Sequence, residues 1–457
     1  MSTPRSLAAP ARFLSREEAK AISDRVLGFA SADETRVSIN SGGRGNTRFA
    51  VNQISTSGDN YDADISIRSV IGKRTGTVTT NKLDDESLRR AVQTAEALAR
   101  LAPEDPELMP ELGPQSYEPD EAWQDATAEL GPTGRASAVQ AITNPAAAAG
   151  LTSTGYLEHQ AGSRAVANSR GLFAYGRSTG AVLTTTVRTP DGTGSGWAGG
   201  ISNSWSDINA AQLGEQAIEK ARRSVNPVAV EPGRYTVVLE PTAVGNLVQL
   251  LGSAFNARSA EEGRSFFSKA GGGTKLGDRV VDPRVTLISD PHDERAPANT
   301  FNGEGMPVTS NTWIENGIVK ALDYDRYWAS RKGVEATQSG GALIMSGGDS
   351  SLEELIASTQ RGLLVTRFWY IRSVDPRTIL YTGLTRDGTF LIENGKVTRP
   401  VKNLRFNESP IFMLNNLEGM GRSVRVSASE SGGVGRGIVV PPIKVRDFNF
   451  TSLSDAI

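Results

Sequence analysis

Few residue types suited to metal or acid–base chemistry occur in this 457-residue sequence. It has no cysteine, which excludes disulfides, thiolate nucleophiles, zinc fingers and iron–sulfur clusters. Only two histidines, His159 and His292, are present to bind a metal or transfer a proton. His159 follows Glu158 in a glycine-flanked strand pattern, which favours a surface or hydrogen-bonded residue over a catalyst.

A serine-hydrolase motif is the first alternative for catalysis. Residues 176–180 fit GxSxG, the nucleophile elbow, with Ser178 as the nucleophile and His292 downstream, as the triad order requires. The elbow must join a buried strand to a helix, whereas residues 181–187 have the pattern of a second strand. A hairpin is therefore the simpler interpretation, and Ser178 stays a candidate in a stand-alone hydrolase.

An acidic cluster around His292 is the second alternative. Asp290, His292, Asp293 and Glu294 could bind a divalent cation, but a solvated loop is the favoured interpretation. Residues 271–275 are rich in glycine but lack the spacing of a phosphate-binding loop, so we expect a flexible loop there.

Residues 366–372 combine aromatic and arginine side chains on a predicted strand. Tryptophan, tyrosine and arginine are the usual anchors of binding interfaces. Arg367 and Trp369 are therefore candidates for contact with a peptide or a partner subunit, while simple filling of a sheet face is the alternative.

Composition excludes several classes of function. The chain has 49 basic and 51 acidic residues, a net charge of −2 and no Lys/Arg block, so we expect no direct nucleic-acid partner. No apolar run approaches the roughly 20 residues that span a bilayer, so we expect no membrane insertion. The polar first residues lack a secretory signal pattern. We expect a cytoplasmic protein whose residues 1–14 are disordered.

The first half of the sequence predicts a sheet with packed helices. Ser15 and Glu18 form a capping box before a helix, and Asp84 and Asp85 can cap a second helix with an apolar stripe over residues 88–99. Strands are expected at 36–39, 47–55, 62–70 and 77–80, hairpins across 155–201, and a helix at 210–224. Five prolines make residues 102–120 an extended connector.

The second half predicts a β-rich domain. A strand at 235–240 leads through Pro241 into an apolar helix that reaches Phe255, and Ser351 and Glu354 cap another helix. Hairpin turns are expected at 316–317, 387–388 and 394–395. The fold class is therefore α+β, with an N-terminal α+β domain at 15–225 and a β-rich C-terminal domain at 226–457.

Segments along the whole chain resemble the TldD/PmbA family of peptide-processing proteins. Each segment is short, but their order and spacing make the set specific. They are RFAVN at 48–52, GTVTTNKL at 76–83, EPGRYTVVL at 231–239, EGRS at 262–265, NGEGMP at 302–307, IENG at 314–317, SLEELI at 351–356, GLLVT at 362–366, FLIENG at 390–395 and PPIKV at 441–445.

The resemblance implies a dimer that encloses a cavity for unfolded peptide, and a division of labour between two types of subunit. TldD-type subunits carry HExxxH on the helix after the strand matched by 235–240, and a late cysteine completes their zinc site. The matching positions here are Gln249, Leu250 and Ala254, none of which can supply the histidine ligands or the general base. The cysteine is absent too.

The resemblance therefore implies a non-catalytic, PmbA-type subunit of a heterodimeric zinc peptidase that processes or degrades small unfolded peptides. We expect no catalytic or metal-binding residue and no cofactor in this chain, with zinc in a TldD-like partner. A non-proteolytic scaffold homodimer is a further alternative. Asn302, Gly303, Glu304 and Gly305 match the acidic-glycine turn of the family and are candidates for peptide or partner binding. Exposed strand edges of the C-terminal domain could bind peptide by strand addition.

Overall fold

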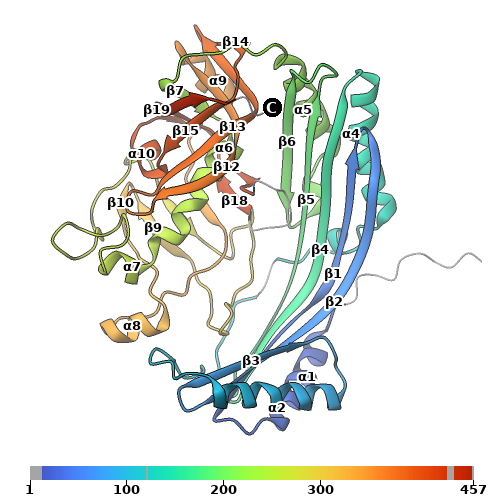
Figure 1. The fold of residues 1–457 in the computed structure, drawn as a ribbon, viewed down its shortest axis with the longest axis vertical. Helices are drawn as coiled ribbons and strands as arrows, with labels where there is room; N and C mark the ends of the chain where they lie inside the picture. The colour runs from blue at the N-terminus through green and yellow to red at the C-terminus, as the bar shows by residue number, and fades with distance from the viewer. Residues whose placement is uncertain (1–12, 120–121, 430–436, 455–457) are drawn as a thin grey trace, which may run out of the picture.

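The computed structural model describes residues 13–119, 122–429 and 437–454, and it has two halves (Figure 1). The start predicted to be disordered comprises residues 1–14, of which residues 1–12 lie outside the described residues. The ring of Phe13 packs at a tilt against Trp123, and the carbonyl of Leu14 accepts hydrogen bonds from Ser163 and Tyr175. A sheet of long curved strands forms the N-terminal half, and two sheets of mostly shorter strands form the C-terminal half.

The N-terminal sheet has six strands, and every neighbouring pair is antiparallel. Its order is β3-β2-β1-β4-β5-β6. The strands are β1 (Glu34–Ala50), β2 (Gln53–Ile71), β3 (Arg74–Thr80), β4 (Thr152–Asn168), β5 (Phe173–Arg188) and β6 (Ser195–Ser202).

The β1–β2 hairpin corrects the expected strand at 47–55. Val51 and Asn52 lie between the strands with φ angles of 51° and 58°, a pair of left-handed residues typical of a two-residue hairpin turn. The Asn52 side chain fixes this turn, because its Nδ2 donates to the carbonyl of Leu151 and its Oδ1 accepts from the amide of Ser153. Neither glycine nor proline marks this turn in the sequence.

Two capped helices, both predicted from the sequence, cover the end of the sheet near β3. Helix α1 (Arg16–Phe29) begins at the Ser15 capping box, and α2 (Asp85–Leu101) begins at Asp84, whose carboxylate accepts from Ser87. Their apolar faces pack on β1 and β2 in one buried cluster. The pattern of apolar residues at helical spacing thus places both helices correctly.

Helices α4 (Pro132–Ala148) and α5 (Ala210–Arg223) cover the other end of the sheet. The sequence predicts α5 but not α4. Helix α4 consists largely of small residues and contains Pro145, so its hydrophobic periodicity is weak. Two short elements, α3 (Asp125–Ala128) and the 3₁₀ helix η1 (Trp205–Asp207), flank it.

A closed ring of five strands forms the centre of the C-terminal half, because β12 pairs with both β7 and β13. The ring consists of β7 (Gly233–Leu239), β12 (Arg361–Asp375), β13 (Leu380–Glu393), β15 (Leu404–Glu408) and β19 (Ile443–Leu453). Strand β14 (Lys396–Pro400) extends it from β13, and β16 (Leu417–Met420) pairs with β19.

The hairpin turn expected at 387–388 is wrong. Asp387 and Gly388 lie inside β13, where both residues oppose Thr366 alone and form a bulge with φ angles of 53° and 127°. The same positive φ angles that favour an Asp-Gly turn also fit a bulge, so the dipeptide does not distinguish them. The expected turns at 316–317 and 394–395 are confirmed.

A second sheet in the C-terminal half has the order β10-β9-β8-β11-β18-β17. Its strands are β8 (Leu287–Ser289), β9 (Asn311–Glu315), β10 (Ile318–Val319), β11 (Leu343–Met345), β17 (Val424–Ser427) and β18 (Gly437–Val440). The helical elements are α6 (Pro241–Val248), η2 (Gln249–Phe255), α7 (Ala257–Glu261), α8 (Arg326–Lys332), α9 (Leu352–Ala357) and α10 (Pro410–Asn415). Across the described parts of the chain, every helix is too short or too polar to cross a bilayer.

The connector between α2 and α3 forms no helix or strand over residues 102–119. The carboxylate of Glu107 accepts two hydrogen bonds from Arg258 on α7, at 2.7 and 2.9 Å. The Tyr117 hydroxyl donates to the carbonyl of Gly305 at 2.6 Å. The connector is therefore tied to the C-terminal half.

Candidate functional site

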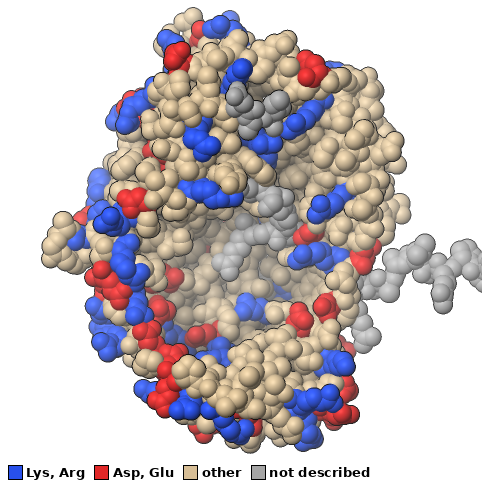
Figure 2. Space-filling view, viewed as in Figure 1, with Lys and Arg blue, Asp and Glu red and all other residues tan. Residues whose placement is uncertain are grey.

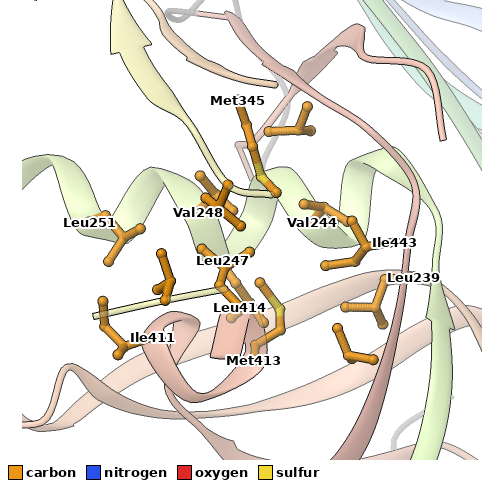
Figure 3. Close-up of a cluster of buried hydrophobic side chains, with 14 of the residues drawn as sticks. Leu239, Val244, Leu247, Val248, Leu251, Met345, Ile411, Met413, Leu414 and Ile443 are labelled. Carbon is orange, nitrogen blue, oxygen red and sulfur yellow. The ribbon is translucent and has the colours of Figure 1, made fainter. Parts of the chain in front are cut away.

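The positions matched to HExxxH lie on η2, directly after α6. The helix is held in the core of the C-terminal half by Val244, Leu247, Val248 and Leu251, which point into a cluster with Met345 and Leu414 (Figure 3). This packing explains the apolar stripe in the sequence. The segment expected as one helix has an α-helical start and a 3₁₀ end.

The three side chains at these positions have structural contacts. Gln249 Nε2 donates to the carbonyl of Ala428 at 2.7 Å and to that of Asn246 at 3.3 Å. Leu250 and Ala254 pack against the C-terminal core. An amide nitrogen that donates to backbone carbonyls cannot also ligate a cation, and the other two side chains have no donor atoms. The residues present do not fit a zinc ion.

The region around His292 does not form a metal site either. The carboxylate of Asp290 accepts from the His292 amide at 2.9 Å, and Asp293 pairs with Arg295 at 2.6 Å. The hydrogen bond from Arg295 lowers the pKa of Asp293. Throughout the described ranges, no three His, Asp or Glu side chains gather in a group that could hold a metal ion.

Ser178 lies within β5, where it pairs with Gly162 of β4. The nucleophile elbow requires a sharp turn from strand to helix, whereas β5 continues to Arg188. The local geometry therefore does not match an elbow, in keeping with the hairpin interpretation.

His159 is buried and hydrogen-bonded. Its Nδ1 lies 3.1 Å from the carbonyl of Thr127, and its Nε2 lies 3.0 Å from Nη1 of Arg135. Since arginine can only donate, Nε2 accepts and Nδ1 carries the proton. Burial lowers the pKa of His159, and the charge of Arg135 lowers it further. Arg135 is fully buried on α4, the helix that hydrophobic periodicity does not reveal.

Arg367 and Trp369 lie on β12 where the two halves meet. The Arg367 guanidinium is 3.0 Å from the carboxylate of Asp387, and it stacks on Trp369 and on Trp197 of β6. Ser195 of β6 donates to the same carboxylate at 2.7 Å. Arg367 thus makes contacts within the chain, and both residues line a cavity of 410 Å³. Their role toward a peptide or partner stays a prediction.

The candidates Asn302 to Gly305 form a tight turn. The Asn302 side chain accepts from the amides of Glu304 and Met306, and Gly305 has a φ angle of 78°. The carboxylate of Glu304 pairs with Arg326 of α8 at 3.0 Å. These contacts define the turn, and its role in peptide or partner binding also stays a prediction.

The structure separates the two candidate groups. Asn302 and Gly303 line a cavity of 330 Å³ between the halves, together with Ser178 of β5. Arg367 and Trp369 line the 410 Å³ cavity instead. Figure 2 shows a hollow between the two halves, with Lys and Arg side chains at several points around it. Arg425 and Asn299 also line the 330 Å³ cavity, and the sequence pattern did not single them out.

Comparison with known proteins matches all three domains of one family. PmbA/TldA metallopeptidase domain 1 matches residues 35–99, the central domain matches 81–225, and the C-terminal domain matches 232–452. Metalloprotease PmbA from Escherichia coli O157:H7 is 22% identical over 407 residues, covering 84% of this chain and 86% of the relative.

Two further relatives are a curated sequence and a solved structure. The Metalloprotease TldD homolog of Haemophilus influenzae is 26% identical over 262 residues, 53% of each chain. The chain spans about half the length of this and other curated relatives that it matches. The crystal structure of TldE from Thermococcus kodakarensis has the same fold, with a TM-score of 0.79 at 19% identity over 96% of this chain and 100% of that one. This chain belongs to the PmbA/TldD family.

Proposed function

We propose that this chain is the non-catalytic, PmbA-type subunit of a heterodimeric zinc peptidase that processes or degrades small unfolded peptides. The observation that carries the proposal is the set of side chains at the zinc-motif positions. Gln249 is hydrogen-bonded to the backbone, and Leu250 and Ala254 pack against the core. A TldD-like partner would supply the zinc and the catalytic base.

An unpaired strand edge supports association with a partner. Strand β3 covers only Ile65 to Ile71 of β2, and no other described strand pairs with residues 53–64 on that side. Residues 53–62 are all exposed. Such an edge presents backbone amides and carbonyls that can pair with another chain, and proteins usually protect edges of this length.

The charge of this edge favours a different chain over a second copy. Residues 53–64 contain Asp59, Asp62 and Asp64 and no Lys or Arg. Asp59 pairs with Arg135, at 2.8 Å, whereas two copies placed edge to edge would bring two sets of these carboxylates together. Like charges across a strand pair are unfavourable. A partner strand with neutral or basic side chains fits better, which supports a heterodimer.

The peptide substrate would be recognised through its main chain, by strand addition or by polar side chains along the inner surfaces. This mode needs no specific side-chain pocket, in keeping with a substrate class defined by its unfolded state.

Reconstitution tests the proposal. This chain is mixed with a TldD-like chain encoded in the same genome, and the complex is sized by sedimentation velocity while peptide cleavage is followed. We expect a one-to-one complex and cleavage by the mixture. A stable homodimer that ignores both the TldD-like chain and peptides would favour the scaffold alternative, and cleavage by this chain alone would favour the hydrolase alternative.

A further inference from the structure

The 330 Å³ cavity between the halves has the features of a small binding site. The N-terminal half contributes Gln160, Arg164 and Asn203, and the C-terminal half contributes Asn299 and Arg425 among others. Its volume is at the lower end of the roughly 300–1,000 Å³ of ligand pockets. Because both halves supply polar side chains, a ligand here would contact both.

The charge of the described lining residues is positive. They include two arginines, Arg164 and Arg425, and no Asp or Glu. Nη1 of Arg425 donates to Oδ1 of Asn203 at 2.6 Å and to the carbonyl of Arg295 at 3.3 Å, and neither acceptor is a carboxylate. Burial lowers the pKa of Arg425 to about 10, with the negative charge of Asp207 opposing the shift. Within the described ranges, the buried guanidinium thus has no carboxylate within ion-pair distance, and its printed acceptors are neutral.

The backbone makes room for this guanidinium. A side chain at Gly437 of β18 would place its Cβ 2.4 Å from Nε of Arg425. Glycine at this position therefore allows Arg425 to lie against the neighbouring strand, and both residues line the cavity.

Among the residues that the structure describes, two buried polar atoms of the cavity lining have no hydrogen-bond partner. Nε of Arg425 is a donor, and Oδ1 of Asn299 is an acceptor. Buried polar groups in proteins are nearly always paired, so one unpaired donor and one unpaired acceptor in the same cavity indicate a ligand that offers the complementary pair.

We propose that this cavity binds a small ligand with a carboxylate and a nearby N–H donor, such as a free amino acid or the carboxyl end of a short peptide. The carboxylate accepts from the Nε edge of Arg425, where side-on pairing of a carboxylate is strong. The N–H group of the ligand donates to Oδ1 of Asn299. This binding depends on neither zinc nor a partner chain, so it is separable from the proposed function.

Isothermal titration of the full chain tests this inference with three probes: L-alanine, L-alanyl-L-alanine and the amidated dipeptide. We expect the dipeptide acid to bind about tenfold or more tightly than its amide, because the amide removes the charge that pairs with Arg425. If L-alanine binds as tightly as the dipeptide, the ligand class is a free amino acid. If L-alanine binds more weakly than the dipeptide, the ligand class is the carboxyl end of a peptide.

Two variants locate the site. Arg425→Gln is expected to lose about tenfold or more of the affinity for the dipeptide, and Asn299→Ala should weaken it without removing the charge. The matched control is Arg284→Gln, which removes a half-exposed arginine of the same half that pairs with Asp282 away from the cavity. Circular dichroism checks that each variant is folded. If Arg425→Gln does not fold, the affinity of Asn299→Ala for the dipeptide provides the test. Equal affinity for acid and amide, unchanged affinity in the folded variants, or no binding would overturn the inference.

Discussion

The guanidinium of Arg367 lies 3.0 Å from Oδ2 of Asp387, and Oδ1 of the same carboxylate accepts from Ser195 at 2.7 Å. Arg367 and Asp387 are on β12 and β13 of the C-terminal half, whereas Ser195 is on β6 of the N-terminal half. The bulge at 387–388 therefore places one buried carboxylate where it joins the two halves.

Asp387→Asn should destabilise the protein by about 3–5 kcal/mol, because it removes the carboxylate charge that pairs with the buried Arg367. The measurement is equilibrium unfolding in urea. Glu393→Gln is the control on the same strand, since Glu393 pairs with Arg399 at the surface and should contribute only about 0–1 kcal/mol. Similar losses in both variants would show that the Arg367–Asp387 pair is not a buried structural link.

Stability should fall on acidification through His159. Its pKa is lowered in the folded state, first by burial and then by Arg135, so the unfolded chain binds the proton more readily. Neutral His159 therefore contributes fully to the free energy of unfolding at a pH above the ordinary histidine pKa of about 6.5. This contribution is lost as the pH falls from there through the lowered pKa of the folded state.

The His159→Gln variant tests this origin, since glutamine can still donate to Thr127 and accept from Arg135. Its free energy of unfolding should depend less on pH between about pH 7 and pH 5 than that of the wild type. Other buried groups, such as Glu408, titrate in both proteins, so the difference isolates His159. Parallel pH profiles would contradict the assignment.

Local sequence signals predict much of the fold, and the misses have physical reasons. The capping boxes at Ser15 and Ser351 correctly mark the starts of α1 and α9. The β1–β2 turn was missed because Val51 and Asn52 adopt left-handed conformations without glycine. Helix α4 was missed because small residues and Pro145 obscure its periodicity.

The candidate site was harder to predict because tertiary contacts determine it. Arg367 lies in a segment whose aromatic and arginine residues are typical of binding interfaces. Its contacts in the fold, Trp197 and Asp387, come from other strands and are not evident from that segment. Arg425 and Asn299 give no motif, and only their shared cavity and unpaired atoms single them out. Local patterns do not record which distant side chains meet.

The turn at 302–305 should be sensitive to a side chain at one glycine and tolerant at another. Gly305→Ala should cost roughly 1–3 kcal/mol, because φ is 78° and the new Cβ would lie 2.6 Å from Leu172. Gly303→Ala should be close to neutral, since its Cβ would meet only the end of the Arg164 side chain at 3.4 Å. Thermal unfolding of both variants checks the difference, and equal effects would contradict this description of the turn.

Charge reversal on the free edge of β2 should weaken association with the TldD-like partner. The double variant Asp62→Lys with Asp64→Lys should slow association several-fold at low salt, since charges at an interface chiefly set the association rate. Glu215→Lys with Glu219→Lys on α5 makes the same change of net charge elsewhere and is the control. Surface plasmon resonance measures the rates, and equal rates for both double variants would place the interface elsewhere.

Zinc content and peptide cleavage, measured for this chain, for the TldD-like chain and for their mixture, test the central claim most directly. We predict that this chain alone holds no stoichiometric zinc and cleaves no peptide, and that the mixture holds zinc and cleaves unfolded peptides in a chelator-sensitive manner. Stoichiometric zinc or chelator-sensitive cleavage by this chain alone would contradict the proposed non-catalytic role.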